Sequence, residues 1–157
     1  MKRLPICLAL ALCSMTALST SARAEGCRSA LVTVSVDWQK EHAPTAAGVV
    51  ARITYPAQVD VPTDPKDHSA RSRVDNLTGA AGGLFDAIPK RNAESEGGIL
   101  SVGLVARDIP PGDFARVRFD CTSGSRPDAQ AFSCVAEVSD LSGLVETPRC
   151  SARVLLE

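Results

Sequence analysis

The residues with the most distinctive chemistry in this 157-residue sequence are its six cysteines and two histidines. Cysteines form disulfides or, often together with histidine, bind zinc. Zinc sites usually contain closely spaced pairs such as C-x-x-C, and no such pair occurs here. Neither His42 nor His68 lies close to a cysteine in the sequence. The spacing therefore favours disulfides over a metal site.

No other group of residues points to a reaction. The G-x-S-x-G turn that positions a nucleophilic serine is absent, and nothing singles out a carboxylate pair for glycoside cleavage. Asp64, Asp67 and His68 form a D-x-x-D-H run without the glycine and terminal glutamate of a calcium loop, so we interpret them as part of a solvated loop. The glycines of residues 77–88 lack the lysine of a phosphate loop. We expect no enzyme activity, no cofactor and no bound metal.

The first 24 residues have the pattern of a secretory signal peptide. Lys2 and Arg3 precede an apolar run from Leu4 to Leu18, and Ala22-Arg23-Ala24 provides a cleavage site. The apolar run is shorter than the roughly 20 residues of a membrane span. Cleavage after Ala24 would leave 157 − 24 = 133 residues, the length of one domain, without a membrane span. We therefore expect an exported protein, periplasmic or extracellular.

Export determines how charge and cysteines are interpreted. Loss of Lys2, Arg3 and Arg23 changes the net charge from −1 to −4, and no Lys/Arg run remains to attract nucleic acid or an anionic membrane. Four cysteines in an exported domain indicate two disulfides, and the residues alone leave all three pairings open. These four are Cys27, Cys121, Cys134 and Cys150.

Two strand-like runs position the central pair of cysteines. Within residues 113–121 every second residue from Ala115 to Cys121 is apolar, and the same alternation in residues 132–138 includes Cys134. A Pro-Pro-Gly-Asp turn at residues 110–113 starts the first run. Both cysteines should therefore point to the apolar side of their strands.

The remaining periodic runs are also strands. They cover residues 32–38, 47–55, 57–61, 97–105 and 150–156, with a surface loop at residues 62–73. The parity of Trp38 and Tyr55 places both rings in the core, and no amphipathic helix of ten or more residues occurs. Seven to nine short strands predict an all-β, single-domain antiparallel β-sandwich.

The order of these runs resembles a cohesin-type domain. The likeness spans Leu31 to Gly143 and consists of VTVSVDW, AGVVARITYPAQVDV, GLF, GGILSVGLV, IPPGDFARVRFDC and VAEVSDLSG. Tyr55-Pro56 resembles the family's Tyr-Asp-Pro without the aspartate, and Pro111-Gly112-Asp113 resembles its P-x-G-D turn. The resemblance implies a nine-stranded jelly roll related to carbohydrate-binding modules, with the first and last strands as parallel neighbours.

The resemblance also implies a disulfide pairing. Parallel terminal strands would bring Cys27 next to Cys150 and leave Cys121 to pair with Cys134, either within a hairpin or across the sandwich. Cohesins bind calcium-loaded dockerin modules through one flat sheet face. The corresponding runs here are residues 57–61, 99–105 and 132–138. Their outward residues, the expected partner-binding set, are Gln58, Asp60, Ser101, Gly103, Ser133, Val135 and Glu137.

Three functional classes follow. The expected one is a non-catalytic module that binds a protein, dockerin-like or other, through one sheet face. A carbohydrate-binding module that retains polysaccharide is the alternative, although sugar platforms use exposed aromatic rings and the sequence has one Trp and one Tyr. A structural protein of the cell envelope is the third. The sequence identifies neither the partner nor a role for calcium.

Overall fold

The computed structural model describes residues 26–39, 45–92, 97–122, 126–143 and 148–157, so the expected signal peptide lies outside the described residues. Within them the chain forms nine β-strands, two short 3₁₀ turns (η1, Arg71–Arg73, and η2, Ala129–Ala131) and no α-helix. The strands are β1 (Ser29–Asp37), β2 (Ala46–Pro56), β3 (Val59–Asp60), β4 (Val74–Asn76), β5 (Leu84–Asn92), β6 (Gly97–Ile109), β7 (Gly112–Cys121), β8 (Ser133–Ser139) and β9 (Arg149–Leu156).

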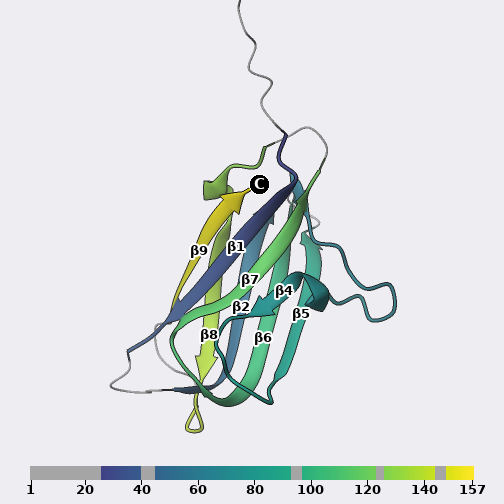
Figure 1. Ribbon diagram of the computed structural model, residues 1–157. Coiled ribbons are helices and arrows are strands. Elements are labelled where there is room, and N and C mark those ends of the chain that lie inside the picture. The colour runs from purple at the N-terminus through teal and green to yellow at the C-terminus, as the bar shows by residue number, and fades with distance from the viewer. Residues whose placement is uncertain (1–25, 40–44, 93–96, 123–125, 144–147) are drawn as a thin grey trace, which may run out of the picture.

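The strands form two sheets that pack face to face (Figure 1). Sheet A has the order β3-β7-β1-β9, with β4 also paired to β7, and sheet B has the order β5-β6-β2-β8. Every pairing in both sheets is antiparallel. The all-β sandwich predicted from the sequence is confirmed, and the strand count matches the nine implied by the resemblance.

The core lies between the sheets and follows the predicted alternation. In β1 the buried residues are Ala30, Val32, Val34 and Val36, while their neighbours are only partly covered. Phe119 of β7 is fully buried, with ring centroids 5.0 Å from Tyr55 of β2 and 5.6 Å from Phe132. Trp38 is also buried, so the predicted core positions of the Trp and the Tyr are confirmed.

The terminal strands are neighbours, but they run antiparallel, and the parallel arrangement implied by the resemblance is wrong. Ala30 pairs with Leu156 at one end of the ladder and Val36 pairs with Cys150 at the other. Cys27 precedes β1 and Cys150 opens β9, so the two cysteines lie at opposite ends of a strand pair about 25–30 Å long at ~3.3 Å per residue. A disulfide between them is excluded by that distance.

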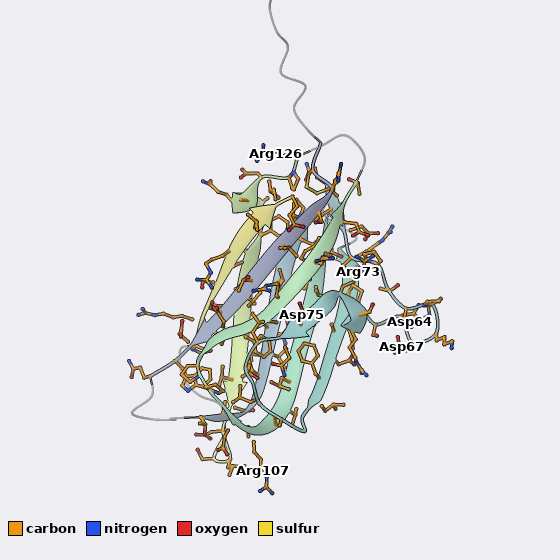
Figure 2. The ribbon with its side chains drawn as sticks, viewed as in Figure 1. Asp64, Asp67, Arg73, Asp75, Arg107 and Arg126 are labelled. Carbon is orange, nitrogen blue, oxygen red and sulfur yellow. A yellow bond between two sulfur atoms is a disulfide. The ribbon has the colours of Figure 1, made fainter. Side chains whose placement is uncertain are left out.

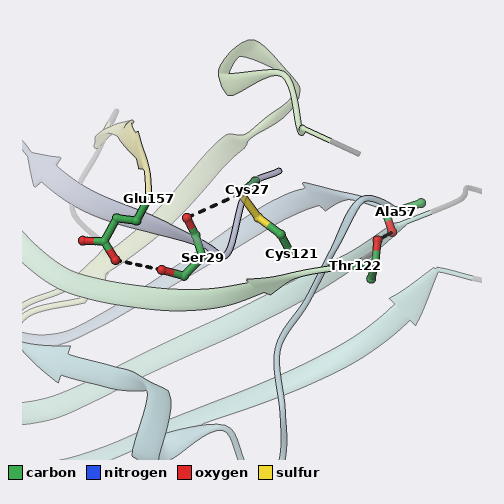
Figure 3. The surroundings of a disulfide bond; sticks show 6 residues. All are labelled: Cys27, Ser29, Ala57, Cys121, Thr122 and Glu157. Atoms are coloured by element: carbon green, nitrogen blue, oxygen red, sulfur yellow. Dashed lines mark hydrogen bonds between the residues drawn. A yellow bond between two sulfur atoms is a disulfide. The ribbon is translucent and has the colours of Figure 1, made fainter. Parts of the chain in front are cut away.

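The disulfides are instead Cys27–Cys121 and Cys134–Cys150, so both predicted pairings are wrong. Cys27 lies beside the end of β7 because Ser29 pairs with Asp120, and the Cys121 N–H donates to the Arg28 carbonyl at 3.1 Å. Figure 3 shows this bridge next to the Ser29–Glu157 hydrogen bond of 2.8 Å. A hairpin bridge between Cys121 and Cys134 does not form because β7 and β8 belong to different sheets. The predicted inward parity of both cysteines agrees with their packing against the core.

The two sheets are connected along one long side of the sandwich by a disulfide and along the other by hydrogen bonds. Cys134–Cys150 joins β8 of sheet B to β9 of sheet A, with 5.6 Å between the Cα atoms. On the other side, the Ala70 N–H donates to the Ala87 carbonyl at 2.7 Å, and the Asp86 carboxylate accepts from the Ala87 N–H at 2.8 Å. Pro89, two residues on, has no N–H to offer. The exposed edge of β5 is thus protected against pairing with another chain at these positions.

Candidate docking face on sheet B

The outer face of sheet B is built from alternate residues of β5, β6, β2 and β8. Strand register places them in four rows, each read in the order β5, β6, β2, β8. The rows are Leu84, Val105, Gly48, Ser139; Asp86, Gly103, Val50, Glu137; Ile88, Ser101, Arg52, Val135; and Lys90, Ile99, Thr54, Ser133.

This face carries most of the exposed large apolar side chains of the described chain. There are six such residues, and four of them, Leu84, Ile88, Val105 and Val135, project from this face with more than half of their surface exposed. Single exposed apolar residues are ordinary, whereas a group on one face marks an interaction surface. The outer face of sheet B is therefore the first candidate for a binding site.

Three of the four charged side chains in these rows, Arg52, Glu137 and Asp86, are paired with one another or with a neighbour, and the fourth, Lys90, lies in the last row. Arg52 Nη1 donates to Glu137 Oε1 at 2.6 Å, and this hydrogen bond, with the attraction between the two charges, lowers the pKa of Glu137 and raises that of Arg52. Arg71 of η1 reaches Asp86 at 3.4 Å. These contacts leave the middle of the face nearly neutral, which suits an uncharged partner surface.

A hollow of about 260 Å³ lies in the first two rows of this face. Its floor is formed where β2 and β6 carry Gly48 and Gly103, which have no side chains, and Leu84, Val105 and Glu137 are among its walls. Small-molecule sites usually have volumes of about 300–1,000 Å³. The hollow is smaller than those sites, and it suits a single inserted side chain.

The outer face of sheet A has a different character. Arg153 makes two hydrogen bonds to the Asp113 carboxylate at 2.8 and 3.0 Å, and Arg73 makes two to Asp120 at 3.1 Å. The hydrogen bond from Ser35 and the nearby arginines lower the pKa of Asp113. Leu155 is the one large apolar residue that is strongly exposed among the described residues of this face. A surface of exposed ion pairs is an ordinary solvated sheet face.

Five of the seven expected partner-binding residues lie together on sheet B: Ser101, Gly103, Ser133, Val135 and Glu137. Gln58 and Asp60 do not, and their assignment to the same sheet is wrong. Pro56 ends β2, and after a turn β3 pairs with β7 of sheet A, where the Thr122 N–H donates to the Gln58 carbonyl at 2.8 Å. Asp60 therefore lies opposite Asp120 in the other sheet.

Sequence reasoning missed Leu84 and Ile88 because β5 was not predicted. The alternation of outward Leu84 and Ile88 with inward Phe85 and Ala87 was a usable signal. The segment was not interpreted as a strand because it follows several glycines and contains Pro89, and proline argues against a central strand. Proline is compatible with β5 because β5 is an edge strand.

The D-x-x-D-H segment is a surface turn. Figure 2 shows Asp64 and Asp67 on a loop that projects away from the sheets. Their carboxylates accept backbone N–H groups two residues on, from Lys66 at 2.8 Å and from Ser69 at 2.9 Å. Among the described residues no group of three His, Cys, Asp or Glu side chains is arranged to hold a metal ion. His42 lies outside the described residues.

A larger hollow, about 830 Å³, lies at the opposite end of the molecule from Arg107 and is lined by Arg28, Arg126 and Glu157 (Figure 2). Its lining adjoins residues 123–125, which are outside the described part, and we place no site there. None of the described residues forms a helix long and apolar enough to cross a membrane.

Comparison with known families, characterised proteins and solved structures finds no match to this chain.

Proposed function

We propose that this protein is an exported, non-catalytic module that binds another protein surface through the outer face of sheet B. The observation that carries the proposal is the contrast between the two outer faces. Four exposed large apolar side chains and a hollow lie on sheet B, whereas Leu155 is the one such side chain among the described residues of the sheet A face, and ion pairs occur on both faces. An apolar, nearly neutral patch loses little on desolvation and gains from burial against a similar surface.

Export is part of the proposal. Two disulfides fit an oxidising compartment, and they agree with the signal-peptide pattern of residues 1–24. The cohesin-type resemblance is retained as a proposal about the mode of binding, a flat sheet face that docks on a partner module. A dockerin-like partner would require calcium, so binding with and without calcium tests this mode.

Carbohydrate binding is the less favoured function. Sugar platforms need an exposed ring face, and Trp38 and Tyr55 are both more than nine-tenths buried. Retention on a polysaccharide column would nevertheless replace the protein-binding proposal, so the two are measured side by side.

The test is capture of partners from the culture fluid and periplasmic extract of the producing cells, with calcium and with a chelator. The wild type should retain a defined protein, and the double variant Ile88→Glu, Val135→Glu should lose it. Leu155→Glu on sheet A is the matched control, since Leu155 is 61% exposed and Val135 is 62% exposed. Equal capture by all three proteins would disprove the proposed face, and dependence on calcium would support a dockerin-like partner.

A further inference from the structure

Besides the hollow, the same end of sheet B carries a protruding apolar residue. Leu141 is 99% exposed and lies two residues after Ser139, which lines the hollow. Tight turns favour Gly, Pro, Asn, Asp and Ser, so the conformation of the turn does not by itself call for a leucine at this position. Its side chain has no cover within the described chain.

The turn that carries Leu141 is held by its own hydrogen bonds. The Asp140 carboxylate accepts from the Ser142 N–H and hydroxyl at 2.7 Å and from the Gly143 N–H at 2.9 Å, and the Asp140 N–H donates to the Gly143 carbonyl at 2.9 Å. These contacts fix the backbone on both sides of the leucine before any binding occurs. A preformed projection loses little entropy when it enters a complementary site.

We propose that a second copy of this chain covers the hollow, with Leu141 of each copy inserted into the hollow of the other. This inference rests on the proposed use of the outer face of sheet B. A symmetric dimer needs a self-complementary surface, and one two-fold axis placed between the projection and the hollow exchanges the two and fills both hollows at once.

Charge is compatible with two identical faces meeting there. Asp86 and Glu137, the acidic residues beside the hollow, are each paired with an arginine of their own copy. Lys90 lies in the fourth row, away from the hollow. Insertion of Leu141 brings the Asp140 carboxylate, which is held by hydrogen bonds from Ser142 and Gly143 of its own turn, near the arginine-paired Asp86 and Glu137 of the other copy. Burial of the apolar residues must outweigh the remaining repulsion between these carboxylates.

The closing experiment measures the mass of the purified, disulfide-bonded protein by sedimentation equilibrium from micromolar to millimolar concentration. The wild type should change from monomer to dimer as its concentration rises. Leu141→Asp removes the projection, and Gly103→Val fills the hollow. Apart from its chain neighbours, a Cβ atom at Gly103 would have one atom within 4 Å, Val50 Cγ2 at 3.9 Å, so that variant should fold, which is checked by its thermal unfolding.

Each variant removes both leucine contacts of the dimer and should weaken self-association by more than about 100-fold, since burial of one leucine corresponds to roughly 10- to 100-fold. Leu155→Asp on sheet A should dimerise like the wild type. An equimolar mixture of Leu141→Asp with Gly103→Val keeps one intact projection and one open hollow. It should associate more strongly than either variant alone.

A wild type that stays monomeric at all concentrations would overturn the inference, and so would a dimer that both variants leave intact. A monomeric wild type that still captures a foreign protein, lost in Ile88→Glu, Val135→Glu, would overturn the dimer and keep the proposed docking face. If the protein neither self-associates nor captures a foreign protein in a way that Ile88→Glu, Val135→Glu abolishes, both the dimer and the docking face are disproved.

Discussion

Replacement of Cys27 and Cys121 by serine should destabilise the protein more than replacement of Cys134 and Cys150. The first disulfide closes a loop with a sequence separation of 94 residues, and the second closes one of 16. In the chain-entropy model a disulfide restricts the unfolded chain by an amount that grows with the logarithm of loop length. The model gives about 4.7 kcal/mol for the long loop and about 3.1 kcal/mol for the short one.

The assay is urea unfolding of the wild type and the two double-serine variants, which leave no free thiol at the replaced site. The free energy of unfolding should differ between the variants by about 1.6 kcal/mol, with the Cys27/Cys121 variant the less stable. Non-reducing peptide mapping of the wild type should recover Cys27 linked to Cys121. An equal or reversed order of stability would show that contacts in the folded state, rather than loop closure, determine the effect of these bridges.

Three further predictions concern the core, the sheet and pH. Phe119→Ala should cost about 3–5 kcal/mol in urea unfolding because it removes a fully buried ring; a loss below 1 kcal/mol would contradict this packing. Gly98→Ala should lower the midpoint of thermal unfolding because its Cβ would clash with the Tyr55 ring, whereas Gly103→Ala on the same strand should leave it nearly unchanged. The pKa of Glu137 in the folded state lies below its usual 4.5, so the unfolded chain binds a proton more readily than the folded one. The free energy of unfolding should therefore fall as the pH drops below about 4.5. Glu137→Gln should lose less of this free energy in acid than the wild type does.

The alternation in the sequence was sufficient to predict the sandwich and most of the core. Apolar residues at every second position fix which side of a strand is inward, as in Val32, Val34 and Val36, because a one-residue slip would reverse every side chain. Alternation says nothing about which strands pair or in which direction. The antiparallel β1–β9 pairing and the disulfides that depend on it were therefore beyond the sequence pattern.

The docking face was predicted in part for the same reason. The three runs came from the cohesin-type resemblance and their outward residues from parity. Five of those residues share one sheet, since β6 and β8 both flank β2: Ser101, Gly103, Ser133, Val135 and Glu137. Gln58 and Asp60 have the right parity, but the chain crosses to the other sheet after Pro56. The hollow depends on Gly48 and Gly103 lying on adjacent strands, and that proximity follows from register, which the sequence does not reveal.

Because β1 lies in the middle of sheet A, it must wait for its partner strands during synthesis of the chain. Its two partners are β7 and β9, and the nearer begins at Gly112, which is 112 − 37 = 75 residues after β1 ends at Asp37. At about 5–20 residues per second, ribosomes need roughly 4–15 s to supply that stretch. Throughout this interval β1, with its row of valines, has both edges unpaired and is prone to aggregate. A chaperone that keeps the nascent chain extended should therefore raise the yield of folded protein, and truncation before β9 should lower it by leaving one edge of β1 permanently open.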